Sequence, residues 1–191
     1  MKHTVVALVE DRPGVLNRVA SLFRRRGFNI DSLAVGTTEE QGISRMTIVV
    51  DGADGIVEQV EKQLYKLIDV VKVSDLTKEE AVLRELALIK VRCNTERRRD
   101  VLDIVEMFRA QVVDVSPTSL IVQVVAAEDR VNALIENLKP FGIRELTRTG
   151  RVAMARGSAT TTVHERESAE VQRFHSESGR LPEGDLPYVS K

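Results

Sequence analysis

The sequence predicts an α+β protein made of two ferredoxin-like βαββαβ domains followed by a flexible C-terminal tail. Short runs rich in Val, Ile and Leu alternate with stretches whose apolar residues recur at helical spacing. The order strand, helix, strand, strand, helix, strand occurs twice along the chain, which is the ferredoxin-like plan. After residue 157 the chain is polar and loses this periodicity. We therefore expect domains at residues 1–77 and 81–157 and a polar, disordered tail at residues 158–191.

The first domain is predicted to begin with a buried strand, residues 2–9, that ends at two acidic residues. Asp11 is predicted to cap a helix that begins at Pro13, because proline lacks the N–H that this position would leave unpaired. Gly27 is predicted to end the helix in a left-handed conformation, after three arginines in its last turn. The predicted apolar face of this helix consists of Leu16, Val19, Ala20 and Phe23.

The remaining elements follow the same patterns of spacing and turns. In the first domain we expect strands at residues 28–37, 42–51 and 70–76, and a helix capped by Asp54 with Ile56, Val60, Leu64 and Leu67 on its apolar face. In the second domain we expect strands at residues 86–91, 112–115, 120–125 and 143–149, and helices with apolar faces at Val101, Ile104, Val105 and Phe108 and at Val131, Leu134, Ile135 and Leu138. The two halves share little sequence, so the predicted repeat is one of architecture.

Composition excludes several classes of protein. The net charge of −1 and the absence of Trp argue against nucleic-acid binding by a basic surface or by base stacking. No apolar run approaches the roughly 20 residues of a membrane-spanning helix, and the N-terminus lacks a signal-peptide pattern. The single cysteine, Cys93, has no partner for an internal disulfide and is predicted to be buried. These features predict a cytoplasmic protein with no nucleic-acid or membrane partner.

No catalytic, metal or cofactor site is predicted on this chain. His3, His164 and His175 each lack a second ligand at metal-binding spacing. No phosphate-binding glycine loop and no nucleophile motif is present. The arginine clusters at residues 24–26 and 97–99 have two interpretations, a solvated surface or a docking site for an acidic protein, and the sequence does not separate them.

The turn at residues 11–15 is the most informative candidate for binding. A helix N-terminus presents unpaired N–H groups and partial positive charge, which suit a carboxylate. Gly14 would allow a ligand to approach the backbone closely. Taken alone, a Pro-Gly helix start is more typical of an ordinary turn than of a binding site.

A second copy of the chain would complete this candidate site. The second strand is predicted to be an edge strand that pairs with another subunit, and to begin at the sheet end that holds the N-terminus of the first helix. Pairing would place Asn29 and Ile30 near residues 11–15 of the other copy. The amide of Asn29 and strand carbonyls would hold an ammonium, while Val15 and Ile30 would enclose a branched aliphatic side chain. The predicted effector-binding residues are Asp11, Gly14, Val15, Asn29 and Ile30.

At these residues the chain resembles the ACT-domain family of amino-acid sensors. The segments GFNIDSLAVG, SRMTIVV, EKQLYKLIDVVKV, RELALIKV, FRAQVVDVSPTSLIVQV and RTGRVAMARG extend the resemblance, over residues 2–157, to the small regulatory subunits of acetolactate synthase. This resemblance implies an N-terminal ACT domain, an ACT-like second domain and a homodimer. It also carries the effector site over to the same five residues.

The resemblance further implies that the chain has a catalytic large subunit as its partner. That subunit would hold thiamine diphosphate, Mg²⁺ and FAD and condense two 2-oxoacids, while this chain would activate it and confer feedback inhibition by valine in branched-chain amino-acid biosynthesis. Asp11 departs from the asparagine of many relatives. Its carboxylate would repel that of an effector, which leaves helix capping or contact with the ammonium as its role. The alternative is a free-standing ACT-type sensor of another enzyme or of transcription, although no helix-turn-helix pattern supports DNA binding.

Overall fold

The computed structural model describes residues 1–53, 55–158 and 160–162. Residues Met1–Thr161 form one compact unit. The predicted tail, residues 158–191, lies almost wholly outside the described residues, as does the predicted helix cap Asp54.

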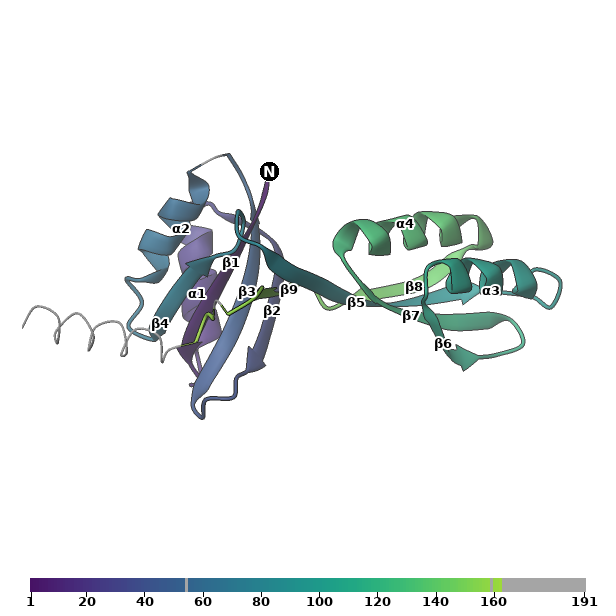
Figure 1. The fold of residues 1–191 in the computed structure, drawn as a ribbon, viewed down its shortest axis with the longest axis horizontal. Coiled ribbons are helices and arrows are strands. Elements are labelled where there is room, and N and C mark those ends of the chain that lie inside the picture. The colour runs from purple at the N-terminus through teal and green to yellow at the C-terminus, as the bar shows by residue number, and fades with distance from the viewer. Residues whose placement is uncertain (54, 159, 163–191) are drawn as a thin grey trace, which may run out of the picture. The chain divides into compact units, whose positions relative to one another are not determined.

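The first domain is a four-stranded antiparallel sheet with two helices on one face (Figure 1). The strand order is β2-β3-β1-β4, so β2 is an edge strand as predicted. The elements in chain order are β1 (Lys2–Glu10), α1 (Val15–Arg26), β2 (Asn29–Thr37), β3 (Ile43–Asp51), α2 (Ile56–Leu64) and β4 (Val70–Asp75).

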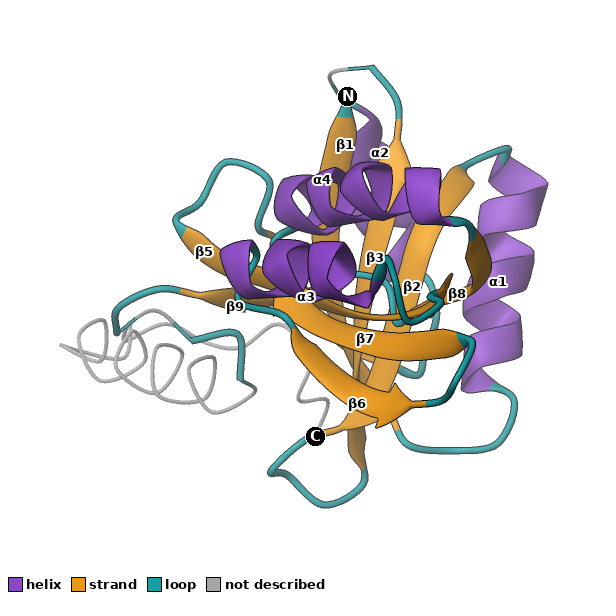
Figure 2. Cartoon of the chain, turned by 90° about the vertical axis from the view of Figure 1, so that its right-hand side faces the viewer, coloured by secondary structure: helices purple, strands orange, loops and turns teal. Residues whose placement is uncertain are grey.

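The second domain repeats this plan, with the order β6-β7-β5-β8. Figure 2 shows α3 and α4 side by side on one face of its sheet. Its elements are β5 (Ala81–Arg92), α3 (Arg98–Met107), β6 (Gln111–Val115), β7 (Ser119–Ala126), α4 (Glu128–Leu138), the 3₁₀ helix η1 (Lys139–Phe141) and β8 (Ile143–Arg148). The α+β class with two ferredoxin-like domains is therefore confirmed.

The sequence did not predict the extension of β5 at its start or the additional strand β9 (Val152–Ala155). Residues 81–84 of β5 pair with β9 to form a short antiparallel ribbon. The ribbon packs against Val6 and Leu76 of the first domain, through Ala153 and partly buried neighbours. It therefore covers the part of the first sheet around β1 on the face that the helices leave open. Both segments are short, and their apolar pattern becomes informative only once this tertiary partner is known.

The start of α1 differs from the prediction. The helix begins at Val15 rather than Pro13, and its N-cap is Gly14, with φ 89° and no side-chain cap. Asp11 therefore does not cap the helix. The reason is that Gly14 adopts the left-handed region, which no helical residue can occupy, so the turn consumes two more residues before the helix starts.

The apolar face of α1 is also shifted by one position. Its buried residues are Val15, Val19, Leu22 and Phe23, whereas Leu16 is 46% exposed. Two overlapping sets of apolar residues satisfy helical spacing here, so periodicity alone could not choose between them. The face predicted for α4 is confirmed in full, and Cys93 is buried as predicted.

Candidate functional site

Backbone hydrogen bonds fix the turn between β1 and α1. The N–H of Asp11 donates to the carbonyl of Gly42 at 2.7 Å, and the N–H of Val15 donates to the carbonyl of Arg12 at 3.3 Å. The side chain of Val15 is only 3% exposed and belongs to the first core, whereas Asp11 and Gly14 are exposed. The structure thus brings the predicted residues Asp11, Gly14 and Val15 together in one rigid turn.

The surface above Gly14 is open. A Cβ atom added at Gly14 would meet nothing within 4 Å. Because α1 has no side-chain cap, helix geometry leaves the N–H groups of Leu16 and Asn17 without an intrahelical acceptor. These groups stand at the positive end of the helix dipole, so the turn can receive a carboxylate.

An ion pair between the half-exposed Arg18 and the buried Asp69, which the sequence analysis missed, braces this turn against the start of β4. Arg18 lies in the first turns of α1, and its Nε is 2.8 Å from Oδ2 of Asp69 while its Nη2 donates to Oδ1 at 3.1 Å. The carbonyl of Asp69 also accepts the N–H of Glu10 at 2.9 Å. Asp69 is 4% exposed. Sequence spacing gives no signal for this pair because its members are 51 residues apart.

Asn29 and Ile30 lie at the other end of the sheet. Asp51 and Ile43 are the two ends of β3. Asn29 of β2 and Lys2 of β1 both pair with Asp51, whereas Glu10, which precedes the turn, pairs with Ile43. The two halves of the predicted site are therefore separated by most of the length of β1, about 25 Å at roughly 3.3 Å per residue. The prediction that β2 begins at the sheet end holding the N-terminus of α1 is wrong. The helix runs back along β1, so the chain returns to its starting end before β2 begins.

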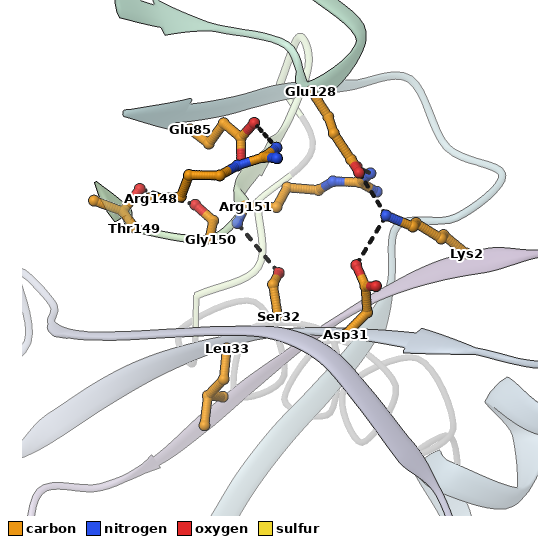
Figure 3. Close-up of a pocket in the computed structure, with 10 residues that line it drawn as sticks. All are labelled: Lys2, Asp31, Ser32, Leu33, Glu85, Glu128, Arg148, Thr149, Gly150 and Arg151. Atoms are coloured by element: carbon orange, nitrogen blue, oxygen red, sulfur yellow. Dashed lines mark hydrogen bonds and ion pairs between the residues drawn. The ribbon is translucent and has the colours of Figure 1, made fainter. Parts of the chain in front are cut away.

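In a single chain the five predicted residues accordingly form two separate groups rather than one pocket. Asn29 is exposed, and Ile30 is half-buried against the first core. None of the five predicted residues lines the polar pocket of about 380 Å³ shown in Figure 3 or the apolar groove of about 460 Å³ beside the second half of β2.

The two arginine clusters differ in the structure. The three arginines that end α1 are exposed. In the second cluster, the guanidinium of Arg97 lies 4.4 Å from the ring centre of Phe141, and Arg98 donates to the carbonyl of Ser116 at 2.8 Å. The second cluster is thus partly engaged within its own domain.

Within the residues that the structure describes, no group of three or more His, Cys, Asp and Glu side chains is placed to hold a metal ion. None of the described helices is both long and apolar enough to cross a membrane.

Comparisons with known proteins agree on one family. Residues 6–72 match the family model of the AHAS small subunit-like ACT domain, and residues 84–157 match that of the small subunit of acetolactate synthase. A probable acetolactate synthase small subunit from Archaeoglobus fulgidus is 57% identical over 83% of this chain and 99% of that protein. The acetolactate synthase small subunit of Aquifex aeolicus is 56% identical over 81% of each chain.

A solved structure supports the same assignment. The crystal structure of an acetolactate synthase small subunit from Thermotoga maritima has a TM-score of 0.78 at 45% identity, over 83% of this chain and 99% of that one. Both family models match in the expected order along the chain, and more than half of the aligned residues are identical between this chain and each of the two relatives named above. The chain therefore belongs to the family of small, regulatory subunits of acetolactate synthase.

Proposed function

We propose that the chain binds valine between the ACT domains of two copies and thereby regulates a catalytic large subunit of acetolactate synthase. One observation supports this proposal above the others: the two half-sites lie at opposite ends of the same sheet, and β2 is its edge. Two β2 edges that pair antiparallel around a two-fold axis bring Asn29 of one copy to the sheet end that holds Gly14 of the other.

The symmetry of such a dimer has two consequences. Because a two-fold interface is self-complementary, it creates two equivalent effector sites, each with one half from either copy. With the axis perpendicular to the sheet, the strands continue from one copy into the next and both helix layers lie on the same side. Effector binding and subunit pairing then become one event, since no half-site can hold the ligand alone.

The chemistry of the two half-sites suits a small zwitterion with an apolar side chain. The first-turn N–H groups of α1 receive the carboxylate, while Oδ1 of Asn29 and strand carbonyls receive the ammonium. Ile30 and the exposed Leu16 offer apolar surface, with Val15 forming the floor beneath them. Asp11 caps no helix N–H group, so its remaining role in this proposal is to face the ammonium.

Regulation requires that valine has different affinities for two states of the enzyme. A coupling of about 1–3 kcal/mol would change activity or affinity by roughly 5-fold to 150-fold. In this proposal the catalytic subunit holds thiamine diphosphate, Mg²⁺ and FAD and carries out the condensation. This chain raises the activity of that subunit and makes it sensitive to valine, and it contributes no reacting group.

The test compares two glycines with the same backbone geometry. Gly14 caps α1 with φ 89° and ψ −10°, and Gly55 caps α2 with φ 91° and ψ −10°; an added Cβ meets nothing within 4 Å at either position. Gly14→Val should abolish valine binding, because the new side chain fills the approach to the helix N-terminus. Titration calorimetry measures this binding. Activation of the catalytic subunit should survive, while inhibition by valine disappears.

Gly55→Val is the matched control, since it imposes the same strain of about 1–2 kcal/mol or more at a different helix. It should bind valine as the unmodified protein does. Valine inhibition that persists in Gly14→Val would refute the site, as would equal losses in both variants. The pair Gly14→Ala and Gly55→Ala repeats the comparison with smaller side chains if either valine variant does not fold.

A further inference from the structure

Charged side chains from both domains meet around the polar pocket shown in Figure 3. Lys2 and Asp31 belong to the first domain, and Glu128 and Arg151 belong to the second. Nζ of Lys2 lies 2.9 Å from Oδ2 of Asp31 and 2.5 Å from Oε1 of Glu128. The other carboxylate oxygen of Glu128 lies 2.5 Å from Nη2 of Arg151. Glu128 thus binds one cation from each domain.

Arg151 makes further contacts with the first domain. Its Nη1 donates to Oγ1 of Thr4 at 2.8 Å, and its backbone N–H donates to Oγ of Ser32 at 3.3 Å. The side chains of Arg151 and Glu128 are only 16% and 25% exposed. Water therefore screens this pair less than it screens a surface pair, and each partner has more than one contact that holds it in place.

These contacts converge on an irregularity in β2. The pairing of β2 with β3 shifts register between Ile30 and Ser32, so Asp31 is the extra residue of a bulge. Gly150 fits closely onto this bulge. It has φ 81°, and an added Cβ would lie 3.2 Å from Cβ of Ser32 and 3.6 Å from the backbone nitrogen of Leu33. A side chain at residue 150 would crowd Ser32, so the two segments would have to shift slightly relative to each other.

We propose that these residues form a latch that carries effector binding at the edge of β2 into the second domain. This inference rests on the proposed function, because Asn29 and Ile30 of the effector site directly precede the bulge. The bulge latch, as we call it, consists of Lys2, Asp31, Ser32, Glu128, Gly150 and Arg151.

The mechanism follows from the position of the bulge. The bulged residue Asp31 has no ladder partner to fix it, so a ligand that draws Asn29 and Ile30 toward a second copy displaces Asp31 more readily than a paired residue, and shifts its neighbour Ser32 with it. Lys2 moves with Asp31 through their ion pair. The segment that contains Gly150 and Arg151 moves with Ser32 through the hydrogen bond between the N–H of Arg151 and Oγ of Ser32. A displacement at the dimer edge is thereby converted into a change in how the second domain is held, and the catalytic subunit responds to that change.

Glu128→Gln tests the latch, and Glu136→Gln is its matched control on the same helix. Glu128→Gln weakens the contacts to Lys2 and Arg151, whereas Glu136 pairs with Lys139, three residues further along, on the exposed surface. In Glu128→Gln, the isolated dimer should bind valine with nearly unchanged affinity. The valine concentration for half-inhibition of the reconstituted enzyme should rise about tenfold, within the usual range of coupling. Glu136→Gln should leave both quantities unchanged.

Hydrogen exchange provides a readout that does not depend on valine. In the ligand-free small subunit, Glu128→Gln should speed exchange at residues 149–156, and Glu136→Gln should not. Gly150→Ala should give the same acceleration, whereas Gly157→Ala, also at positive φ but with nothing within 4 Å, should not. Unchanged exchange in Glu128→Gln, or valine inhibition equal to that of the unmodified protein, would overturn the latch. An unmodified protein that binds no valine would instead refute the proposed function, and the exchange result would still decide whether these contacts hold the domains.

Discussion

The two domains follow one plan, yet their sheets are covered differently. In the first domain, residues 3–9 of β1 are all buried, because helices cover one face and the β5–β9 ribbon covers the other. In the second domain the last eight residues of β5 alternate between buried and more exposed, as expected for a sheet with one covered face. Val6 and Leu88 occupy equivalent positions on the two central strands, yet Val6 is 1% exposed and Leu88 is 36% exposed. A shared topology therefore does not imply a shared core.

The turns that precede the first helix of each domain also differ. In the first domain Gly14 leaves the helix N-terminus uncapped and open. In the second, the N–H of Arg97 donates to Oδ1 of Asn94 at 3.1 Å, and the guanidinium of Arg97 lies over Phe141. The first-turn N–H groups of α3 also lack a side-chain cap, so the two turns differ in how the residue before the helix is held. The open helix start of the first domain is the one that the proposed effector site requires.

The largest predicted effect tests the covering of the two sheets. Val6→Lys places an unpaired charge between the first sheet and the ribbon, and it should lower the free energy of unfolding by about 3–5 kcal/mol. Leu88→Lys introduces the same side chain on the open face of the second sheet, where it reaches water, and should change stability by about 0.5 kcal/mol or less. Urea denaturation followed by circular dichroism measures both. Similar losses in the two variants would contradict the difference in covering.

The sequence predicted the order of the eight principal strands and four helices because each carries its own apolar periodicity. It could not predict β9, because four residues that alternate in burial become a strand only against a tertiary partner. It placed the start of α1 two residues early, because neither Pro13 nor Asp11 reveals that Gly14 adopts a left-handed conformation. The Arg18–Asp69 pair and the bulge latch join residues far apart in the chain, and no local pattern marks them.

The five predicted site residues are a different case. Their identities came from a turn motif and a family resemblance, and the structure places three of them in one turn. The reasoning that joined them was wrong about the end of the sheet at which β2 begins. The corrected geometry strengthens the requirement for a second copy, since Asn29 and Gly14 of one chain lie too far apart to share a small ligand.

An intermediate effect distinguishes the first residues of the two edge strands. Asn29 begins β2 and Gln111 begins β6, and both are exposed on the edge of their sheets. Asn29→Ala should weaken valine binding about tenfold, because a hydrogen bond to a charged group is lost at an interface. Gln111→Ala should leave the affinity unchanged. Titration calorimetry on the dimers provides the comparison, and equal affinities for the two variants would remove Asn29 from the site.

The smallest effect concerns the contact that joins the two domains. The hydrogen bond from Lys2, aided by Arg151, holds the pKa of Glu128 below its ordinary value of 4.5, against the opposing effect of burial. A lowered pKa in the folded protein means that this carboxylate stabilises the fold above pH 4.5, and that the contribution disappears as the pH falls through the lowered pKa. Glu128→Gln should therefore be less stable than the unmodified protein at pH 7, with a difference that shrinks in acid. Denaturation of both proteins between pH 7 and about pH 3 measures this difference. A difference that stayed constant over this range would show that the ionised carboxylate of Glu128 does not stabilise the contact between the domains.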